Sequence, residues 1–88
     1  MRVVIAEDLV LLRDGLVRML TDTGHEVVAA VSTAPDLVAA VTEHQPDLSI
    51  VDVRMPPTFR DEGLRAALAI RRREPKTPIL ILSQYVER

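Results

Sequence analysis

The sequence predicts an α/β domain, a parallel sheet with helices on both faces. Four short runs rich in valine, isoleucine and leucine have the length of strands, and they span residues 2–6, 27–32, 48–53 and 78–83. Three of these runs are nearly continuous rather than alternating, which is typical of strands covered on both faces. Helical spacing between the runs gives the order βαβαβαβ, which favours parallel strands joined by right-handed crossovers. The 88 residues are enough for one domain.

Each segment between the strands repeats apolar residues three or four positions apart, as one face of a helix does. Gly24 is a stop signal for the first helix, and Pro46 and Pro75 end the second and third. Thr33 is a candidate N-cap of the second helix, with Pro35 in its first turn. The residues that share the face of the first helix are Leu9, Leu12, Leu16, Met19 and Leu20, and those of the second are Leu37, Ala40, Val41 and His44. In the third helix, the residues expected to face the core are Leu64, Ala67, Leu68 and Ile70.

Composition limits the possible functions. With 11 basic and 13 acidic residues the net charge is −2, so no broad basic surface is available for nucleic acid, and Arg71-Arg72-Arg73 is interpreted as a solvated helix end. The chain has no cysteine, which excludes disulfides and thiolate metal sites. No apolar run approaches the about 20 residues that span a bilayer, and acidic residues interrupt the N-terminus too early for a signal peptide. A cytoplasmic location without membrane contact is therefore expected.

Acidic residues stand where the predicted strands end. Glu7 and Asp8 follow the first run, Asp52 lies near the end of the third, and Ser83 closes the fourth. In open α/β sheets, ligands bind outside the carboxyl ends of the strands. If the first and third strands are neighbours, three carboxylates converge there, and a hard divalent cation such as Mg²⁺ relieves their repulsion. The pattern suggests a magnesium site that handles phosphate.

Each of these residues also has a purely structural interpretation. Asp8 could merely cap the first helix, and Asp52 could cap a turn. Met55-Pro56-Pro57 alone is a rigid turn, and Ser83 alone is an ordinary residue where a strand stops. Their joint occurrence at three strand ends, in order, favours the functional interpretation.

In this order and spacing, the motifs resemble those of bacterial response-regulator receiver domains. The residues that carry the resemblance, which extends over essentially the whole chain, are Glu7-Asp8, Asp52-Val53-Arg54-Met55-Pro56 and Leu82-Ser83. The stretch 51–68, with Met-Pro-Pro and Asp61-Glu62-Gly63-Leu64-Arg65, is similar to receivers of the NarL type. The resemblance implies a flavodoxin-like, doubly wound sheet of strand order 2-1-3-4 over residues 1–88. It also implies a two-component system whose parent protein regulates transcription through a DNA-binding domain.

The resemblance implies a role for each matching residue. Asp52 would accept a phosphoryl group from a sensor histidine kinase, so the chain would be a phosphoacceptor that assists its own phosphotransfer and dephosphorylation rather than an enzyme. The ligands of Mg²⁺ would be Glu7, Asp8, Asp52 and the backbone carbonyl of Arg54. The groups that bind the phosphoryl oxygens would be the Ser83 hydroxyl and the Gln84 amide, and the loop after the acceptor would be shaped by Met55 and Pro56.

The sequence departs from the family pattern toward its C-terminus. The family normally supplies a lysine at the end of a fifth strand, whereas the single lysine here is Lys76, in the loop before the fourth strand. The fifth strand and helix, most of the fourth helix and any DNA-binding domain are expected to be missing. The fourth strand would then be a bare apolar edge, and such edges invite pairing with another chain. We therefore expect self-association, as a dimer, through this edge or through exchanged elements.

Two other functions compete with this one. A receiver-like module that contacts partners or dimerises without phosphorylation is favoured by the missing lysine and opposed by the intact acidic set. A phosphohydrolase of the haloacid dehalogenase type usually carries a second aspartate two residues after its nucleophile, where this chain has Arg54. Nucleotide binding of the Rossmann type lacks its signature, because the three glycines are scattered and no GxGxxG follows the first strand.

Overall fold

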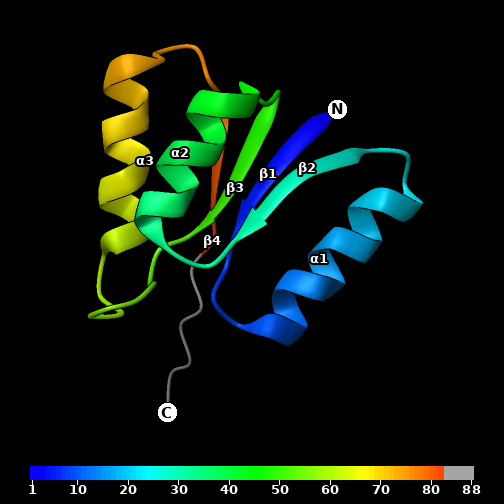
Figure 1. Cartoon of the computed structure of the whole chain (residues 1–88), viewed down its shortest axis with the longest axis horizontal. Helices are drawn as coiled ribbons and strands as arrows, with labels where there is room; N and C mark the ends of the chain where they lie inside the picture. Colours follow the sequence, from blue (N-terminus) through cyan, green and yellow to red (C-terminus); the bar gives the residue numbers. More distant parts are fainter. Residues whose placement is uncertain (83–88) are drawn as a thin grey trace.

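The computed structural model describes residues 1–82 and shows strands and helices in strict alternation (Figure 1). The strands are β1 (Arg2–Ala6), β2 (Glu26–Val31), β3 (Leu48–Asp52) and β4 (Ile79–Leu82), and the helices are α1 (Val10–Asp22), α2 (Ala34–His44) and α3 (Glu62–Arg73). All strand pairs are parallel, and the sheet order is β2-β1-β3-β4. The predicted fold class and the strand order 2-1-3-4 are confirmed. Ser83 and Gln84 lie outside the described residues.

Local sequence signals set the helix ends. Thr33 Oγ1 accepts a hydrogen bond from the Asp36 amide at 3.3 Å, so Thr33 is the N-cap of α2 as predicted. α2 ends before Gln45, which is left-handed with φ 45°, and Pro46 follows. The N-cap position of α1 is Leu9, and it has no side-chain capping bond. Asp8 therefore does not cap this helix, and its structural interpretation as a cap is wrong.

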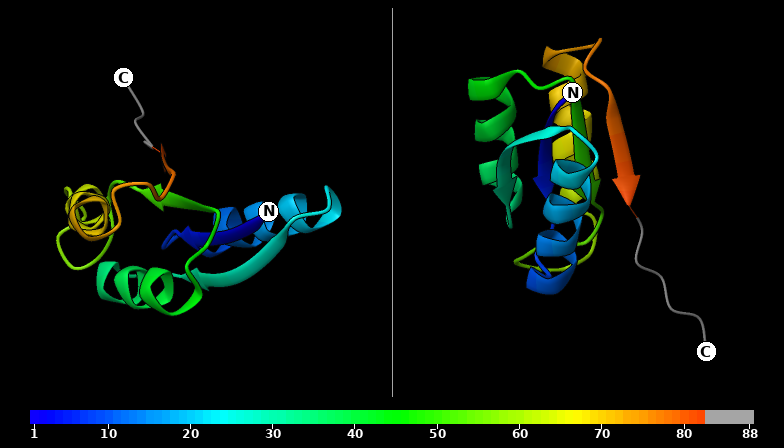
Figure 2. Two further views of the ribbon diagram at one scale, coloured as in Figure 1. Left: turned by 90° about the horizontal axis from the view of Figure 1, so that it is seen from above. Right: turned by 90° about the vertical axis from the view of Figure 1, so that its right-hand side faces the viewer.

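α2 and α3 lie side by side on one face of the sheet (Figures 1 and 2). The main core lies beneath them, and its buried residues are Val4, Ala6, Leu37, Ala40, Val41, Val51, Met55, Ala66 and Ile70. The prediction that Leu64 and Leu68 face the core is wrong, because these side chains are 41% and 51% exposed. The buried side of α3 consists of Gly63, Ala66, Ala67 and Ile70. Three of these four residues are small, so they let the helix approach the sheet closely.

α1 lies on the other face of the sheet, where it packs mainly against β1 and β2. The buried residues of this second cluster are Val3, Ile5 and Ile50, and α1 contributes only partly buried side chains to it. Within residues 1–82, β4 pairs with β3 alone, so its outer edge has no strand neighbour there. No helix in this part of the chain has the length and apolar character needed to cross a membrane.

Candidate functional site

The sheet register brings the acidic residues to one edge. Ala6 of β1 pairs with Val51 of β3, so the residues that follow these two strands emerge side by side. One carboxylate oxygen from each of Glu7, Asp8 and Asp52 lies within 4.8 Å of the other two. The structure thus places three of the predicted site residues together at the carboxyl ends of the central strands, where ligands of such sheets bind.

Two of the three carboxyl groups are buried. Glu7 is 0% and Asp52 2% exposed, whereas Asp8 is half-buried. Side chains alternate along a strand, so Glu7 continues the row of Ile5, and Asp52 continues the row of Ile50. Both acidic residues therefore belong to the face that α1 covers. Asp8 is the group through which the site meets solvent.

Burial and crowding change the acidity of this pair. The pKa of Glu7 is raised from 4.5 to about 7, mainly by burial and in smaller part by the Asp52 and Asp8 carboxyl groups, against a lowering effect of the Leu9 amide. That amide donates to Glu7 Oε2 at 3.1 Å. Burial also raises the pKa of Asp52, while its hydrogen bonds with Glu7 and the Arg54 amide lower it. The site without a cation therefore retains a proton near neutral pH, because three charges so close together are unfavourable.

The donor set fits a small, hard divalent cation. All three groups offer carboxylate oxygens, which Mg²⁺ prefers, and they are close enough to share one ion. A bound cation would compensate the charge that burial and the neighbouring carboxyl groups make unfavourable here, so the electrostatics favour a cation as the geometry does.

The loop after Asp52 holds further predicted residues. The Arg54 side chain is exposed, and its amide donates to Asp52 Oδ1 at 3.3 Å, so Asp52 also forms the short turn that its structural interpretation required. Met55 is 0% exposed and belongs to the main core, which anchors the loop. Pro56 is half-buried. Lys76 is exposed and lies in the loop that leads into β4. It is therefore at the N-terminal ends of the strands, opposite the acidic site.

Sequence reasoning missed two residues that support the site. A Cβ atom on Gly63 would lie 1.7 Å from the backbone oxygen of Asp52, so only glycine lets the first turn of α3 lie against Asp52. A glycine in the first turn of a predicted helix is the signal that could have revealed this close approach. Arg13 Nη1 donates to the Glu7 carbonyl at 3.1 Å and holds the turn after β1. Nothing in the spacing of Arg13 indicates this contact.

A doubly wound parallel sheet with a cluster of carboxyl groups at the carboxyl ends of its central strands is typical of receiver domains. The chain belongs to the response regulator receiver domain family, whose model matches residues 3–88. Receiver domains are signalling domains of two-component response regulators rather than classical enzymes, and in general they bind Mg²⁺ at an acidic cluster.

Homologues of the chain include NarL-type and LuxR-family response regulators. It is 38% identical over 87 residues to the transcriptional regulatory protein PdtaR of Mycobacterium tuberculosis, a match that covers 99% of this chain and 40% of the relative. It is also 38% identical over 86 residues to the oxygen regulatory protein NreC of Staphylococcus haemolyticus, covering 97% of this chain and 39% of the relative. The chain thus spans about two-fifths of the length of these relatives.

A solved structure shows the same fold. The signal receiver domain of a NarL response regulator from Mycobacterium tuberculosis superposes with a TM-score of 0.85 at 33% identity, over 98% of this chain and 68% of that one. A LuxR-family response regulator from Aurantimonas gives the same TM-score of 0.85 at 26% identity, over 97% of this chain and 59% of that one.

Proposed function

We propose that this chain is a phosphoacceptor whose Asp52 takes a phosphoryl group from a sensor histidine kinase, with Mg²⁺ bound at the acidic site. The observation that carries the proposal is the group of three carboxyl groups within 4.8 Å, two of them buried. The proposed ligands of the ion are Glu7, Asp8, Asp52 and the carbonyl of Arg54. The parent protein regulates transcription from the cytoplasm through a separate DNA-binding domain.

The proposed reaction is a transfer between two side chains. An Asp52 carboxylate oxygen forms a bond to phosphorus, the bond from phosphorus to the kinase histidine nitrogen breaks, and that nitrogen keeps the electron pair. When bound, Mg²⁺ supplies positive charge that neutralises the attacking carboxylate and the phosphoryl oxygens. The Arg54 amide holds Asp52 Oδ1 and so orients the attacking carboxylate. In the same proposal the Ser83 hydroxyl and the Gln84 amide bind the transferred phosphoryl group, and Met55 and Pro56 keep the loop in place.

Intact-mass spectrometry after incubation with Mg²⁺ and acetyl phosphate tests this function. The native chain is expected to gain one phosphoryl group, and an Asp52→Ala variant none. Asp36→Ala is the matched control, because Asp36 is an exposed carboxylate outside the group of three and should leave the adduct intact. A folded native chain that gains no phosphoryl group would overturn the proposal.

A second candidate is a receiver-like module that contacts partners without phosphorylation. It is favoured by the exposed apolar side chains of β4, Leu80 and Ile81, which offer a surface for partner contacts. Such a module has no need of the cation. Calorimetric titration with Mg²⁺ separates the two functions, because heat of binding that disappears in Asp8→Asn supports the phosphoacceptor.

Self-association is a further part of the proposal. Leu80 and Ile81 of β4 are 49% and 36% exposed, and the outer edge of β4 lacks a strand neighbour within residues 1–82. An exposed apolar edge pairs readily with a second strand. The proposed occupant is the β4 strand of a second copy, since identical patches can meet across a two-fold axis.

A further inference from the structure

The loop between β3 and α3, residues 53–61, is closed on itself by backbone bonds. The Gly63 amide donates to the Val53 carbonyl at 2.9 Å, and the Phe59 amide donates to the Met55 carbonyl at 3.0 Å. Met55 is buried in the main core, but the residues from Pro57 to Arg60 are exposed. Packing therefore anchors the loop at Met55, and the exposed residues need polar contacts to keep their path.

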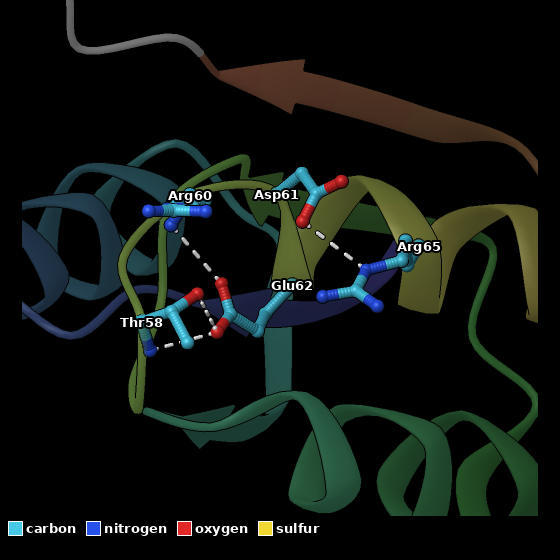
Figure 3. A network of polar contacts seen from close by, with 5 residues as sticks. All are labelled: Thr58, Arg60, Asp61, Glu62 and Arg65. Carbon is cyan, nitrogen blue, oxygen red and sulfur yellow. Dashed lines mark hydrogen bonds and ion pairs between the residues drawn. The ribbon is translucent and has the colours of Figure 1, made fainter.

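One carboxylate supplies those contacts. Glu62, the first residue of α3, accepts hydrogen bonds from the Thr58 amide at 2.8 Å, the Thr58 hydroxyl and the Arg60 amide at 3.1 Å (Figure 3). Both carboxylate oxygens are used. These donors lower the pKa of Glu62 to about 2, so the group is charged at any pH of physiological interest. A charged acceptor at the N-terminus of a helix makes stronger bonds than a neutral one.

The neighbouring carboxylate does something different. Asp61 precedes Glu62 and makes an exposed ion pair with Arg65, with 3.1 Å between Asp61 Oδ1 and Arg65 Nε (Figure 3). It makes no side-chain bond that caps the helix. The two acidic residues carry the same charge at the same helix end, yet only Glu62 holds the loop. Asp61 is thus a matched control for Glu62.

The loop and the acceptor are mechanically connected. The first turn of α3 lies against the Asp52 carbonyl so closely that Gly63 has no room for a side chain. Arg54, two residues after the acceptor, donates its amide to Asp52 Oδ1 at 3.3 Å. Residues 58–60 thus connect to the surroundings of Asp52 by two routes: the Phe59 amide bonds to the carbonyl of Met55, next to Arg54, and Glu62 joins Thr58 and Arg60 to the turn of α3 that lies against Asp52.

We infer that Glu62 is a positioning residue for the acidic site: by tying residues 58–60 to the first turn of α3, it fixes the loop that places the Arg54 backbone beside Asp52. The effect on Mg²⁺ follows if the proposed function holds, since the Arg54 carbonyl is one of the proposed ligands. Groups that orient metal ligands typically change metal affinity about 10- to 100-fold when they are removed. If the Glu62 contacts served stability alone, their removal would lower the melting temperature and leave the Mg²⁺ affinity unchanged.

The test compares Glu62→Ala, Glu62→Gln and Asp61→Asn with the native chain. Titration with Mg²⁺ is expected to show affinity lowered about 10-fold in Glu62→Ala, since this variant loses a group that orients a ligand. Glu62→Gln keeps an acceptor oxygen and is expected to recover part of the affinity, and Asp61→Asn to match the native chain. Equal affinity in Glu62→Ala and the native chain would overturn the inference, as would an equal loss in Asp61→Asn.

A second measurement separates this inference from the proposed function. Backbone amide NMR shifts without metal report the Asp52–Arg54 turn directly. They are expected to move at Val53 and Arg54 in Glu62→Ala, and to stay in place in Asp61→Asn. If the native chain bound no Mg²⁺, the proposed function would fail, and these shifts alone would decide the inference. Unmoved shifts in a folded Glu62→Ala variant would contradict it.

Discussion

The two faces of the sheet are covered to very different degrees. On one face, α2 and α3 close over a cluster of nine buried residues, whereas on the other α1 contributes no buried residue and the cluster has three. The acidic site belongs to the thinner face, since Glu7 and Asp52 continue the rows of Ile5 and Ile50. The difference indicates that the α2/α3 face contributes most of the buried core, whereas the α1 face holds the acidic site.

The largest expected change in stability comes from a cavity in the core beneath α2 and α3. Leu37 is 0% exposed, so Leu37→Ala should lower the free energy of unfolding by about 3 kcal/mol, from lost burial and the cavity left behind. Leu16→Ala removes the same atoms from a half-buried position on α1 and should cost about 1 kcal/mol. Urea unfolding followed by circular dichroism measures both. Equal losses would show that the two faces contribute alike.

The pH dependence of stability reports the site on the α1 face. Glu7 has a pKa of about 7 in the folded chain against 4.5 as its ordinary value, so the folded state binds more protons between these values. The stability that this group contributes is present below pH 4.5 and is lost as the pH rises through 7. Asp52 acts in the same direction, since its pKa is also raised.

Without metal, the free energy of unfolding should therefore fall between pH 5 and 8 by on the order of 1–3 kcal/mol after allowance for solvent screening, and the melting temperature should fall with it. Mg²⁺ should restore stability more at pH 8 than at pH 6, because the cation binds the deprotonated group. Glu7→Gln should remove most of the slope. Glu62 does not interfere, since its pKa of about 2 places its loss of stability in acid. A metal-free chain that became more stable toward pH 8 would contradict this electrostatic picture.

The sequence predicts the parts of the molecule that depend on local patterns. The strands, the Thr33 cap and the stops at Gly24 and Pro46 are local, and the structure has them within a residue of the predicted places. The meeting of Glu7 and Asp52 needs β1 beside β3, which local patterns do not contain and the family resemblance supplied. The roles of these residues stay predictions, as do those of Ser83 and Gln84.

Other features depend on packing that periodicity does not report. The spacing of Leu64 and Leu68 suits a buried stripe, but the small residues of α3 turn toward the sheet and leave both leucines outside. The contacts of Glu62 depend on the path of a loop whose residues have no period at all. Gly63 was visible as part of a family motif, yet its contact with the Asp52 carbonyl required the position of α3.

A smaller effect, of opposite sign, is expected from Ser49 on the α2/α3 face. Ser49 is 0% exposed, and its hydroxyl has no hydrogen-bond partner among the residues that the structure describes. A buried polar group without a partner is unfavourable, so Ser49→Ala should raise the free energy of unfolding by about 1 kcal/mol. Ser32→Ala, at a half-buried serine after β2, serves as control. Destabilisation by Ser49→Ala in urea would mean that the hydroxyl has a partner after all.

The smallest change in monomer stability is expected from a substitution in β4, the outer strand of the sheet. This substitution tests the proposed self-association. Leu80 pairs in register with Ile50, so it lies beyond the part of the α1 face that α1 covers. Lysine on an edge strand blocks pairing with another strand, so Leu80→Lys should leave the fold intact and abolish dimers in sedimentation velocity at high micromolar concentration. Leu11→Lys changes a leucine of α1 that is 90% exposed and should dimerise like the native chain. Loss of dimers in Leu11→Lys alone would move the interface to α1, and a native chain that stayed monomeric would overturn the proposed self-association.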